Sequence, residues 1–341
     1  MIDILSMGFD ELGDYIASIG EARFRTGQVF SWLHSGVSSF DEMSNISKEL
    51  RKKLSEECVI SSAECVRCQK SKYDGTRKYL LRFSDGNCVE SVFMKYNHGN
   101  TVCISTQVGC RMGCKFCAST KNGLVRNLLP SEMLSELFAI IKDTGERISN
   151  IVLMGTGEPL DNYDNVIRFL HLVNDERGLN IGMRHISLST CGLCEKIEKL
   201  SEENLPITLS VSLHAPTDEK RNAIMPVNKA YGVERLIKEC KDYFNRTSRR
   251  ISFEYTMIKD KTDGIESAHE LVRLLGGFPC HVNLIPLNRI SGGELSPSGS
   301  EAIQKFKDCL ENGGITVTVR RSLGADIDAA CGQLRQNYIS K

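Results

Sequence analysis

Cys110-Arg-Met-Gly-Cys114-Lys-Phe-Cys117 places three cysteines in the spacing Cys-x₃-Cys-x₂-Cys. A loop this short can bring three thiolates to three corners of a cubane iron–sulfur cluster, with no nearby protein ligand for the fourth iron. Clusters that only carry electrons normally have four cysteine ligands, whereas a metal site with an open position is arranged for chemistry on a bound molecule. Gly109 and Gly113 fit this reading, because a backbone that folds closely around a cofactor needs residues without a Cβ. The spacing therefore predicts a reactive iron–sulfur site.

A zinc site or a redox dithiol is the alternative for Cys114 and Cys117, since Cys-x₂-Cys pairs occur in both. A zinc site would need a second half with matching spacing. The chain has two other such pairs, Cys65–Cys68 and Cys191–Cys194, and neither has a third ligand in register. The cysteine spacing therefore favours the cluster over zinc.

The composition is that of an ordinary soluble globular protein, with 41% hydrophobic and 25% charged residues among 341. No window approaches a membrane-spanning length, and 14 cysteines without a signal peptide predict a reducing cytoplasm and no membrane association. The 43 basic residues equal the 43 acidic ones, which argues against indiscriminate polyanion binding. The zero net charge is still compatible with a structured RNA partner, because basic residues cluster locally, as in Arg51-Lys52-Lys53.

The chain divides into a small front part and a large main part. Phe9, Leu12 and Ile16 recur at helical spacing and predict helices at the start. Two apolar runs then flank Asp85-Gly86, which predicts a β-hairpin. The expected units are a helical accessory domain (1–57), a hairpin linker (58–95), a main domain (96–334) and a tail (335–341).

Strand and helix patterns alternate throughout the main domain, which predicts an α/β fold with a parallel sheet. Six or seven such units are too few to close an eight-fold barrel, so a partial barrel is expected. Ligands bind at the C-terminal ends of the strands in such folds, and the cysteine loop directly follows the first predicted strand. The expected strands are 102–107, 151–154, 185–189, 207–213, 251–258, 281–285 and 315–320. The expected helices are 131–144, 163–173, 195–202, 233–244, 265–275 and 300–312.

Polar residues follow several of these strands at the edge where ligands should bind. Met154-Gly-Thr-Gly157-Glu158-Pro comes directly after the second strand, and its glycines allow close backbone approach to a ligand. Glu158 can accept hydrogen bonds from an ammonium group or from ribose hydroxyls. Further polar positions at later strand ends are Ser189, Ser212-Leu213-His214 and Asn288. Each alone could be an ordinary loop residue, but together they predict a polar-lined pocket.

Three residues outside this rim each have two readings. Cys331, in a small-residue stretch past the last strand, is either an inert thiol or a reactive thiolate. Cys103, on the first strand of the main domain, is either a buried core residue or a second reactive thiol. Glu90, in the preceding strand, is either an outward-facing residue or a base.

The motifs together resemble a known family. The cysteine spacing, with Phe116 before the last cysteine, is similar to that of the radical S-adenosylmethionine superfamily, and the wider set resembles its RNA adenine methyltransferase branch, the RlmN type. That set is Gln107-Val-Gly-Cys110, Met154-Gly-Thr-Gly-Glu-Pro-Leu160, Leu188-Ser-Thr190, Ser212-Leu-His-Ala-Pro216, Asn283-Leu-Ile-Pro286 and Asp326-Ile-Asp-Ala-Ala-Cys-Gly-Gln333. The last motif is the most specific, since generic superfamily members lack it. The resemblance runs from about residue 24 to residue 334 and implies a partial (β/α)₆ radical S-adenosylmethionine barrel with the helical domain and hairpin in front.

The resemblance also implies cofactors and residue roles. Cys110, Cys114 and Cys117 would bind one [4Fe-4S] cluster. S-adenosylmethionine, two molecules of which are consumed per turnover, would be bound by Gly157, Glu158, Ser189, Ser212, Leu213, His214 and Asn288. Cys331 would carry a methyl group, Cys103 would release a covalent protein–RNA adduct through a transient disulfide with Cys331, and Glu90 would accept a proton.

The implied reaction is methylation of carbon 2 of an adenosine in 23S rRNA, near the peptidyl transferase centre, and of an adenosine in a tRNA anticodon loop. The implied partners are these RNAs and an electron donor such as flavodoxin or ferredoxin, with the enzyme a monomer. One alternative is the antibiotic-resistance branch, which methylates carbon 8 of the same rRNA adenosine. A more distant one is an iron–sulfur or zinc module that binds RNA without methylating it.

Overall fold

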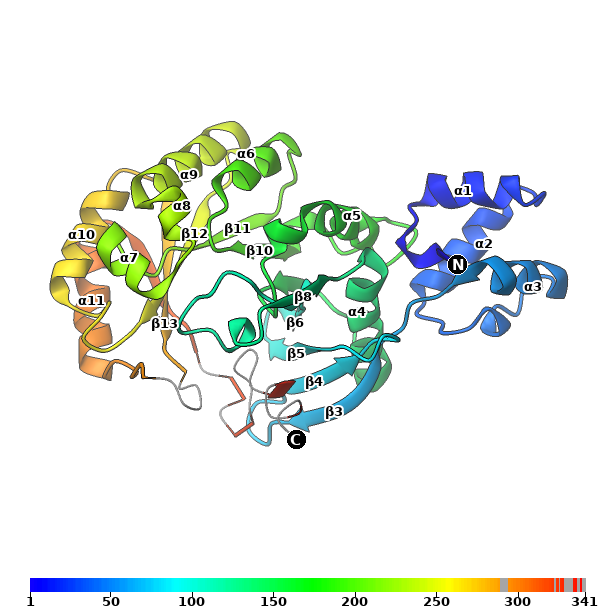
Figure 1. Ribbon diagram of the computed structural model, residues 1–341, viewed down its shortest axis with the longest axis horizontal. Coiled ribbons are helices and arrows are strands. Elements are labelled where there is room, and N and C mark those ends of the chain that lie inside the picture. Colours follow the sequence, from blue (N-terminus) through cyan, green and yellow to red (C-terminus); the bar gives the residue numbers. More distant parts are fainter. Residues whose placement is uncertain (289–293, 322, 325, 328–333, 336–337, 339–341) are drawn as a thin grey trace.

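A ten-stranded mixed sheet organises the chain, whose computed structural model describes residues 1–288, 294–321, 323–324, 326–327, 334–335 and 338 (Figure 1). The strand order is β14-β13-β12-β11-β10-β9-β6-β5-β4-β3. From β6 to β14 neighbouring strands are parallel, and from β6 to β3 they are antiparallel. The outer strands, β3 and β14, do not pair with each other in the described part of the chain. The sheet is therefore the wall of an open barrel, as predicted.

The parallel part consists of six strand–helix units and a final strand, because each strand but the last is followed by a helix that covers the outer face. The strands are β6 (Gly99–Cys103), β9 (Asn150–Leu153), β10 (Ile186–Thr190), β11 (Thr208–Ser212), β12 (Ile251–Met257), β13 (Cys280–Pro286) and β14 (Thr316–Val319). The covering helices are α4 (Pro130–Thr144), α5 (Tyr163–Asn174), α6 (Cys194–Glu202), α9 (Val233–Thr247), α10 (Ile265–Leu275) and α11 (Ser300–Asn312). This confirms the predicted partial (β/α)₆ barrel.

Two features of this part were not predicted. Two short helices, α7 (Asp218–Ile224) and α8 (Asn228–Tyr231), lie between β11 and α9. The predicted strand over 102–107 is wrong in its bounds, because β6 already ends at Cys103. Gln107–Gly109 forms a separate strand, β7, which pairs antiparallel with β8 (Leu124–Asn127). The cysteine run thus lies between the strands of its own small hairpin.

The front part contains three helices at one end of the molecule, next to α4 and α5 (Figure 1). They are α1 (Phe9–Ser18), α2 (Arg25–His34) and α3 (Lys48–Glu57), and short strands β1 (Ile2–Asp3) and β2 (Cys58–Val59) pair beside them. Ser47 caps α3, since its Oγ accepts a hydrogen bond from the Leu50 N–H. Arg168 on α5 reaches the front part through two bonds to Glu11, at 2.6 and 2.8 Å.

The predicted hairpin extends the parallel sheet. Strands β4 (Arg77–Arg82) and β5 (Cys88–Tyr96) pair antiparallel across the Asp85-Gly86 turn, β3 (Glu64–Lys70) pairs with β4, and β5 pairs with β6. Short 3₁₀ turns complete the fold at Ile4–Ser6, Phe40–Glu42, Ala118–Thr120, Pro159–Asn162 and Met183–His185. None of the described helices has the length and apolar character needed to cross a membrane.

Lys78 on β4 and Glu90 on β5 form a buried ion pair in this extension, with 2.9 Å between Nζ and Oε2 and side-chain exposures of 0% and 4%. Removing one partner of such a pair leaves a buried charge without its counter-ion, which typically costs about 3–5 kcal/mol. We expect Lys78→Met to lower the free energy of unfolding of the apoprotein by about that amount, measured by urea denaturation.

The matched control is Lys70→Met, on β3. The Lys70 Nζ lies 4.0 Å from Asp143 and its side chain is 57% exposed. An exposed pair of this kind is worth about 0–1 kcal/mol, so this variant should unfold almost like the wild type. Equal unfolding free energies for the two variants would contradict the importance of the buried pair.

Candidate active site

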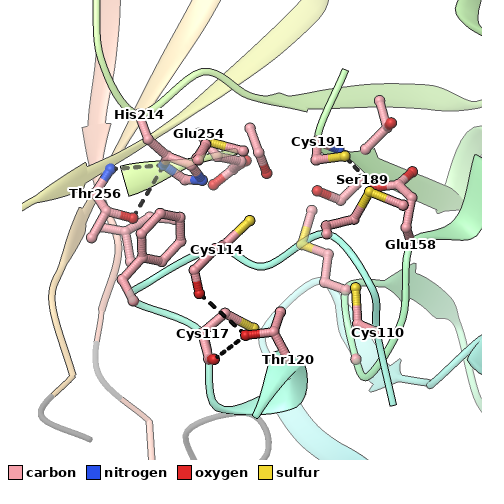
Figure 2. A pocket seen from close by; sticks show the side chains of 18 of the residues that line it. Cys110, Cys114, Cys117, Thr120, Glu158, Ser189, Cys191, His214, Glu254 and Thr256 are labelled. Carbon is pink, nitrogen blue, oxygen red and sulfur yellow. Dashed lines mark hydrogen bonds between the residues drawn. The ribbon is translucent and has the colours of Figure 1, made fainter. Parts of the chain in front are cut away.

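A cavity opens at the C-terminal ends of the parallel strands, where the sequence predicted a ligand site. Figure 2 shows the cysteine loop on one side of this cavity and the strand-end residues on the other. Of the predicted site residues, the structure brings these together in its lining: Cys110, Cys114, Cys117, Gly157, Glu158, Ser189, Ser212, His214 and Asn288. Leu213 is fully buried behind the wall and is not part of the lining.

The β7–β8 hairpin holds the cysteine loop in a closed shape. The Cys110 N–H donates to the Gly123 carbonyl at 2.9 Å and closes the base of the loop. Gly109 has φ = 80°, and a Cβ there would lie 2.0 Å from the Gly123 oxygen, so only glycine fits. At the other end, the Thr120 hydroxyl donates to the carbonyls of Cys114, at 3.3 Å, and Cys117, at 3.0 Å. The backbone is thus fixed on both sides of the three thiols.

The loop cysteines fit an iron–sulfur cluster as a donor set. All three line one cavity, and burial raises the pKa of the Cys110 thiol to about 12 and that of Cys114 still further. These groups would therefore become thiolates by binding a metal rather than by ionising alone. Among the described residues, no three His, Cys, Asp or Glu side chains converge closely enough to hold a single metal ion. A cluster is compatible with a wider separation, because each of its irons takes one thiolate.

Glu158 is held as a fixed hydrogen-bond acceptor. Its Oε2 accepts from the Cys191 N–H at 2.7 Å, and its Oε1 accepts from the Leu160 N–H at 3.1 Å. Burial raises the pKa of this carboxyl, while the two N–H groups act to lower it. Gly157 has φ = 113°, and a Cβ there would lie 2.8 Å from the backbone nitrogen of Gln107. The Gln107 Oε1 in turn accepts from the Glu158 N–H at 2.9 Å, so this rim motif is tied to the hairpin that carries the cysteines.

His214 presents a defined tautomer to the cavity. Its Nδ1 accepts a hydrogen bond from the Thr256 N–H at 3.0 Å, so the ring proton of the neutral form is on Nε2. Burial lowers the pKa of His214 to about 3, which keeps the ring neutral at physiological pH. The residue has φ = 58°, a left-handed conformation that costs energy in a non-glycine residue. The ring also packs edge-on against Phe116 of the cysteine loop, with 4.7 Å between centroids.

Several lining residues were missed by the sequence reasoning. Glu254 lies in the middle of β12 with its side chain in the cavity wall, and its Oε2 accepts from the Asn283 amide at 2.8 Å. Burial raises the pKa of this carboxyl. The alternation of Ser252, Glu254 and Thr256 with apolar residues in β12 was the available signal, because it places the polar set on one face of a buried strand. Cys191 also lines the cavity, next to Glu158.

Cys103 and Glu90 are not among the residues that line the cavity. Cys103 ends β6 opposite Val92 of β5, and Glu90 points to the same face because it is two residues away. Cys103 belongs to a buried apolar cluster against which Met154 packs, and Met154 also lines the cavity. Met154 thus links the buried cluster that contains Cys103 to the lining of the cavity.

Cys331 lies outside the described residues. Described residues on both sides of it pack on the strand face that carries Cys103 and Glu90. Leu323 packs against the Cys103 cluster, and the Arg335 N–H donates to Glu90 Oε1 at 2.6 Å.

Comparisons with known proteins agree with this geometry. Residues 104–275 match the family model of the radical SAM superfamily, and residues 2–60 match that of the ribosomal RNA large subunit methyltransferase N-terminal domain. A radical SAM methyltransferase from Sphaerobacter thermophilus has the same fold, with a TM-score of 0.93 at 39% identity over 98% of this chain and 99% of that one. The chain is therefore a radical S-adenosylmethionine enzyme.

Similar full-length proteins show which family of radical S-adenosylmethionine enzymes this is. A probable dual-specificity RNA methyltransferase RlmN from Lachnospira eligens is 54% identical over 99% of this chain and 97% of its own length. The corresponding protein of Clostridium novyi is 50% identical over 99% of each chain. The chain belongs to the RlmN family of radical S-adenosylmethionine RNA methyltransferases, whose superfamily uses a [4Fe-4S] cluster and S-adenosylmethionine.

Proposed function

We propose that this chain methylates carbon 2 of an adenosine in 23S rRNA and of an adenosine in a tRNA anticodon loop. The observation that supports this most strongly is the shared cavity of the cysteine loop and the polar strand ends, in a chain that matches dual-specificity relatives over nearly its whole length. A carbon at this position of adenine is not nucleophilic. The cluster and S-adenosylmethionine, when bound, supply the radical chemistry that such a carbon requires.

The residues of the cavity divide between the two cofactors. Cys110, Cys114 and Cys117 would hold the cluster. The opposite wall offers the carboxylate of Glu158, the Nε2–H of His214, and the hydroxyls and amide of Ser189, Ser212 and Asn288, and Gly157 also lines it. Leu213, buried behind this wall between Ser212 and His214, would complete the S-adenosylmethionine site. These groups suit an amino acid with an ammonium and a carboxylate joined to a ribose.

The remaining residues would act on the methyl group and the RNA. The Cys331 thiolate would take and present the methyl group, since the thiolate is the nucleophilic form of cysteine. Cys103 would attack the Cys331 sulfur and release the product, leaving a disulfide that cellular thiols reduce. Glu90 would accept the proton lost from the ring. The target base would have to be unstacked to enter, as in other enzymes that modify bases.

The same proposal covers the partners. Residues 1–57 would form an accessory domain that helps to hold RNA, joined by a linker over 58–95 to the catalytic domain over 96–334, with a tail over 335–341. The enzyme would act as a cytoplasmic monomer that receives electrons from a flavodoxin or ferredoxin. The family model matched by residues 2–60 comes from methyltransferases of the large ribosomal RNA, which supports a role of the front part in RNA binding.

Mass spectrometry of the RNA of a deletion strain tests this function. We expect 2-methyladenosine to disappear from 23S rRNA and from the tRNA fraction, and to return when the wild-type gene is restored. Loss of 8-methyladenosine alone would instead assign the chain to the carbon 8 branch. Unchanged nucleosides would contradict both assignments.

A further inference from the structure

Arg221 on α7 is a fully buried cation next to the cavity. Its side chain is 0% exposed. It donates four hydrogen bonds, from Nε to the Leu213 carbonyl at 3.0 Å, from one terminal nitrogen to Asn228 Oδ1 at 2.8 Å, and from the other to the carbonyls of Cys191 at 2.7 Å and Ser212 at 3.0 Å. Arg221 thus joins the ends of β10 and β11, where Ser212 and Leu213 belong to the predicted S-adenosylmethionine site.

All four acceptors of Arg221 are neutral oxygens. Within the described residues, no carboxylate lies at ion-pair distance from its guanidinium, and Asp218 is reached only through the Asn228 amide, at 2.9 Å. Burying a charge without an ionic partner is expensive, so such a residue calls for an anion nearby. Burial lowers the pKa of Arg221, and the groups that favour its charged form are, in order, Cys191, Cys114, Cys194 and Asp218. The first two of these cysteines line the cavity, and Cys114 is a predicted cluster ligand.

The segment after Arg221 also supports the cysteine loop. The Lys115 N–H donates to the Ile224 carbonyl at 2.9 Å. Cys114 and Cys191 belong to one buried apolar cluster with Ile224 and Met225. Arg221 therefore lies in the element on which the cluster-binding loop rests, behind the wall that carries Cys191.

We propose that Arg221 is a positioning residue whose buried positive charge offsets the charge of the iron–sulfur cluster and makes the cluster easier to reduce. This inference rests on the proposed ligands Cys110, Cys114 and Cys117. A cluster with three thiolate ligands is anionic, and its reduction adds one more negative charge. A nearby cation stabilises the reduced form more than the oxidised form, in proportion to the added charge. Net charge near the cluster is one of the factors that set its reduction potential.

The test measures the midpoint potential of the reconstituted cluster in the full-length protein by redox titration followed by electron paramagnetic resonance. Arg221→Gln removes the charge and keeps an amide donor, whereas Arg221→Lys keeps the charge and loses the forked geometry. We expect a more negative midpoint potential in Arg221→Gln and a value near that of the wild type in Arg221→Lys.

Lys220→Gln is the matched control, because it removes one positive charge from the neighbouring position of the same helix. The Lys220 Nζ bonds Ser267 and Glu270 of α10, at 2.8 and 3.1 Å, and is not part of the cavity lining. This variant should keep the wild-type potential. An equal shift in Lys220→Gln would overturn the proposal, since it would show that any charge on this helix has the same effect.

The two Arg221 variants also test the role of the charge directly. A wild-type potential in Arg221→Gln overturns the proposal, and so does a shift in Arg221→Lys as large as that in Arg221→Gln. If Arg221→Gln holds no iron, Arg221→Lys decides alone: iron at the wild-type potential supports the role of the charge, and loss of iron there too assigns Arg221 to the fold of the site. A wild-type protein that holds a cluster but leaves adenosine unmodified would contradict the proposed function and leave this comparison intact.

Discussion

Replacing Cys114 by alanine is expected to reduce the iron content after anaerobic reconstitution from about four irons per chain to well under one, following cluster stoichiometry. Methylation of RNA should become undetectable as a result. The physical reason is that each of the three cysteines supplies the only protein ligand of one iron, so removing one leaves that iron without a protein ligand. The apoprotein should still fold, because removal of one small buried side chain costs on the order of 1 kcal/mol. Iron and sulfide analysis, with circular dichroism of the apoprotein, measures both effects.

Cys65→Ala is the control for this prediction. Cys65 is exposed on β3, far in the sheet order from the cavity, and belongs to one of the other Cys-x₂-Cys pairs. Its replacement should leave the iron content unchanged. Full iron content in Cys114→Ala would show that the loop cysteines do not bind the cluster. Stoichiometric zinc in the wild type would favour the alternative of a zinc site.

Replacing Cys103 by serine should stop the enzyme after a single turnover and trap RNA on the protein. A serine hydroxyl cannot form a disulfide with Cys331, so the covalent link to the adenosine would persist. Cys103 ends β6 and belongs to the buried cluster against which Met154, a lining residue, packs. Because Cys103 itself does not line the cavity, its replacement should leave the lining unchanged. Denaturing gel electrophoresis with labelled RNA should show most of the chain in a slower band.

Two further variants make this result specific. Cys103→Ser combined with Cys331→Ala should give no adduct, because the attachment point is gone. Cys280→Ser changes another buried strand cysteine, at the start of β13, and should turn over normally. Normal multiple turnover by Cys103→Ser would rule out its role in product release, and full activity of Cys331→Ala would rule out the two-cysteine mechanism.

Much of the fold could be predicted, because periodic patterns report which face of an element is buried. The strands and helices of the main domain lie within a few residues of the predicted ranges. The errors have local causes. The stretch from residue 102 to residue 107 was predicted as one strand, but β6 ends at Cys103 and Gln107 pairs instead with Asn127 of β8. Helix α7 has the sequence Asp-Glu-Lys-Arg-Asn-Ala-Ile, which lacks an apolar stripe, so the N-cap Thr217 and the acidic first turn were the only signals of a helix there.

The site was predictable where it follows strand ends, and less so where it depends on tertiary contacts. Ser189, Ser212 and His214 could be placed at one rim because parallel strands end at the same edge. Glu254 is in the middle of a strand, and only the alternation within β12 indicated its direction. Arg221 gave no signal at all, because an arginine in a short polar helix is normally exposed, and its burial results from acceptors that converge from Cys191, Ser212 and Leu213.

The attachments on either side of Cys331 bear on the order in which the protein folds. Gly324 donates to Asp74, Asp326 accepts from the Lys72 N–H and Arg335 donates to Glu90, so these bonds join residues that lie 245 to 254 positions apart. Such distant contacts carry a large loop-closure cost and form only once the intervening chain is organised. We therefore expect these described residues to attach late, to a sheet that already exists. The segment that carries Cys331, the proposed methyl-carrying thiol, would thus be anchored on both sides only after the strands with Cys103 and Glu90 have formed.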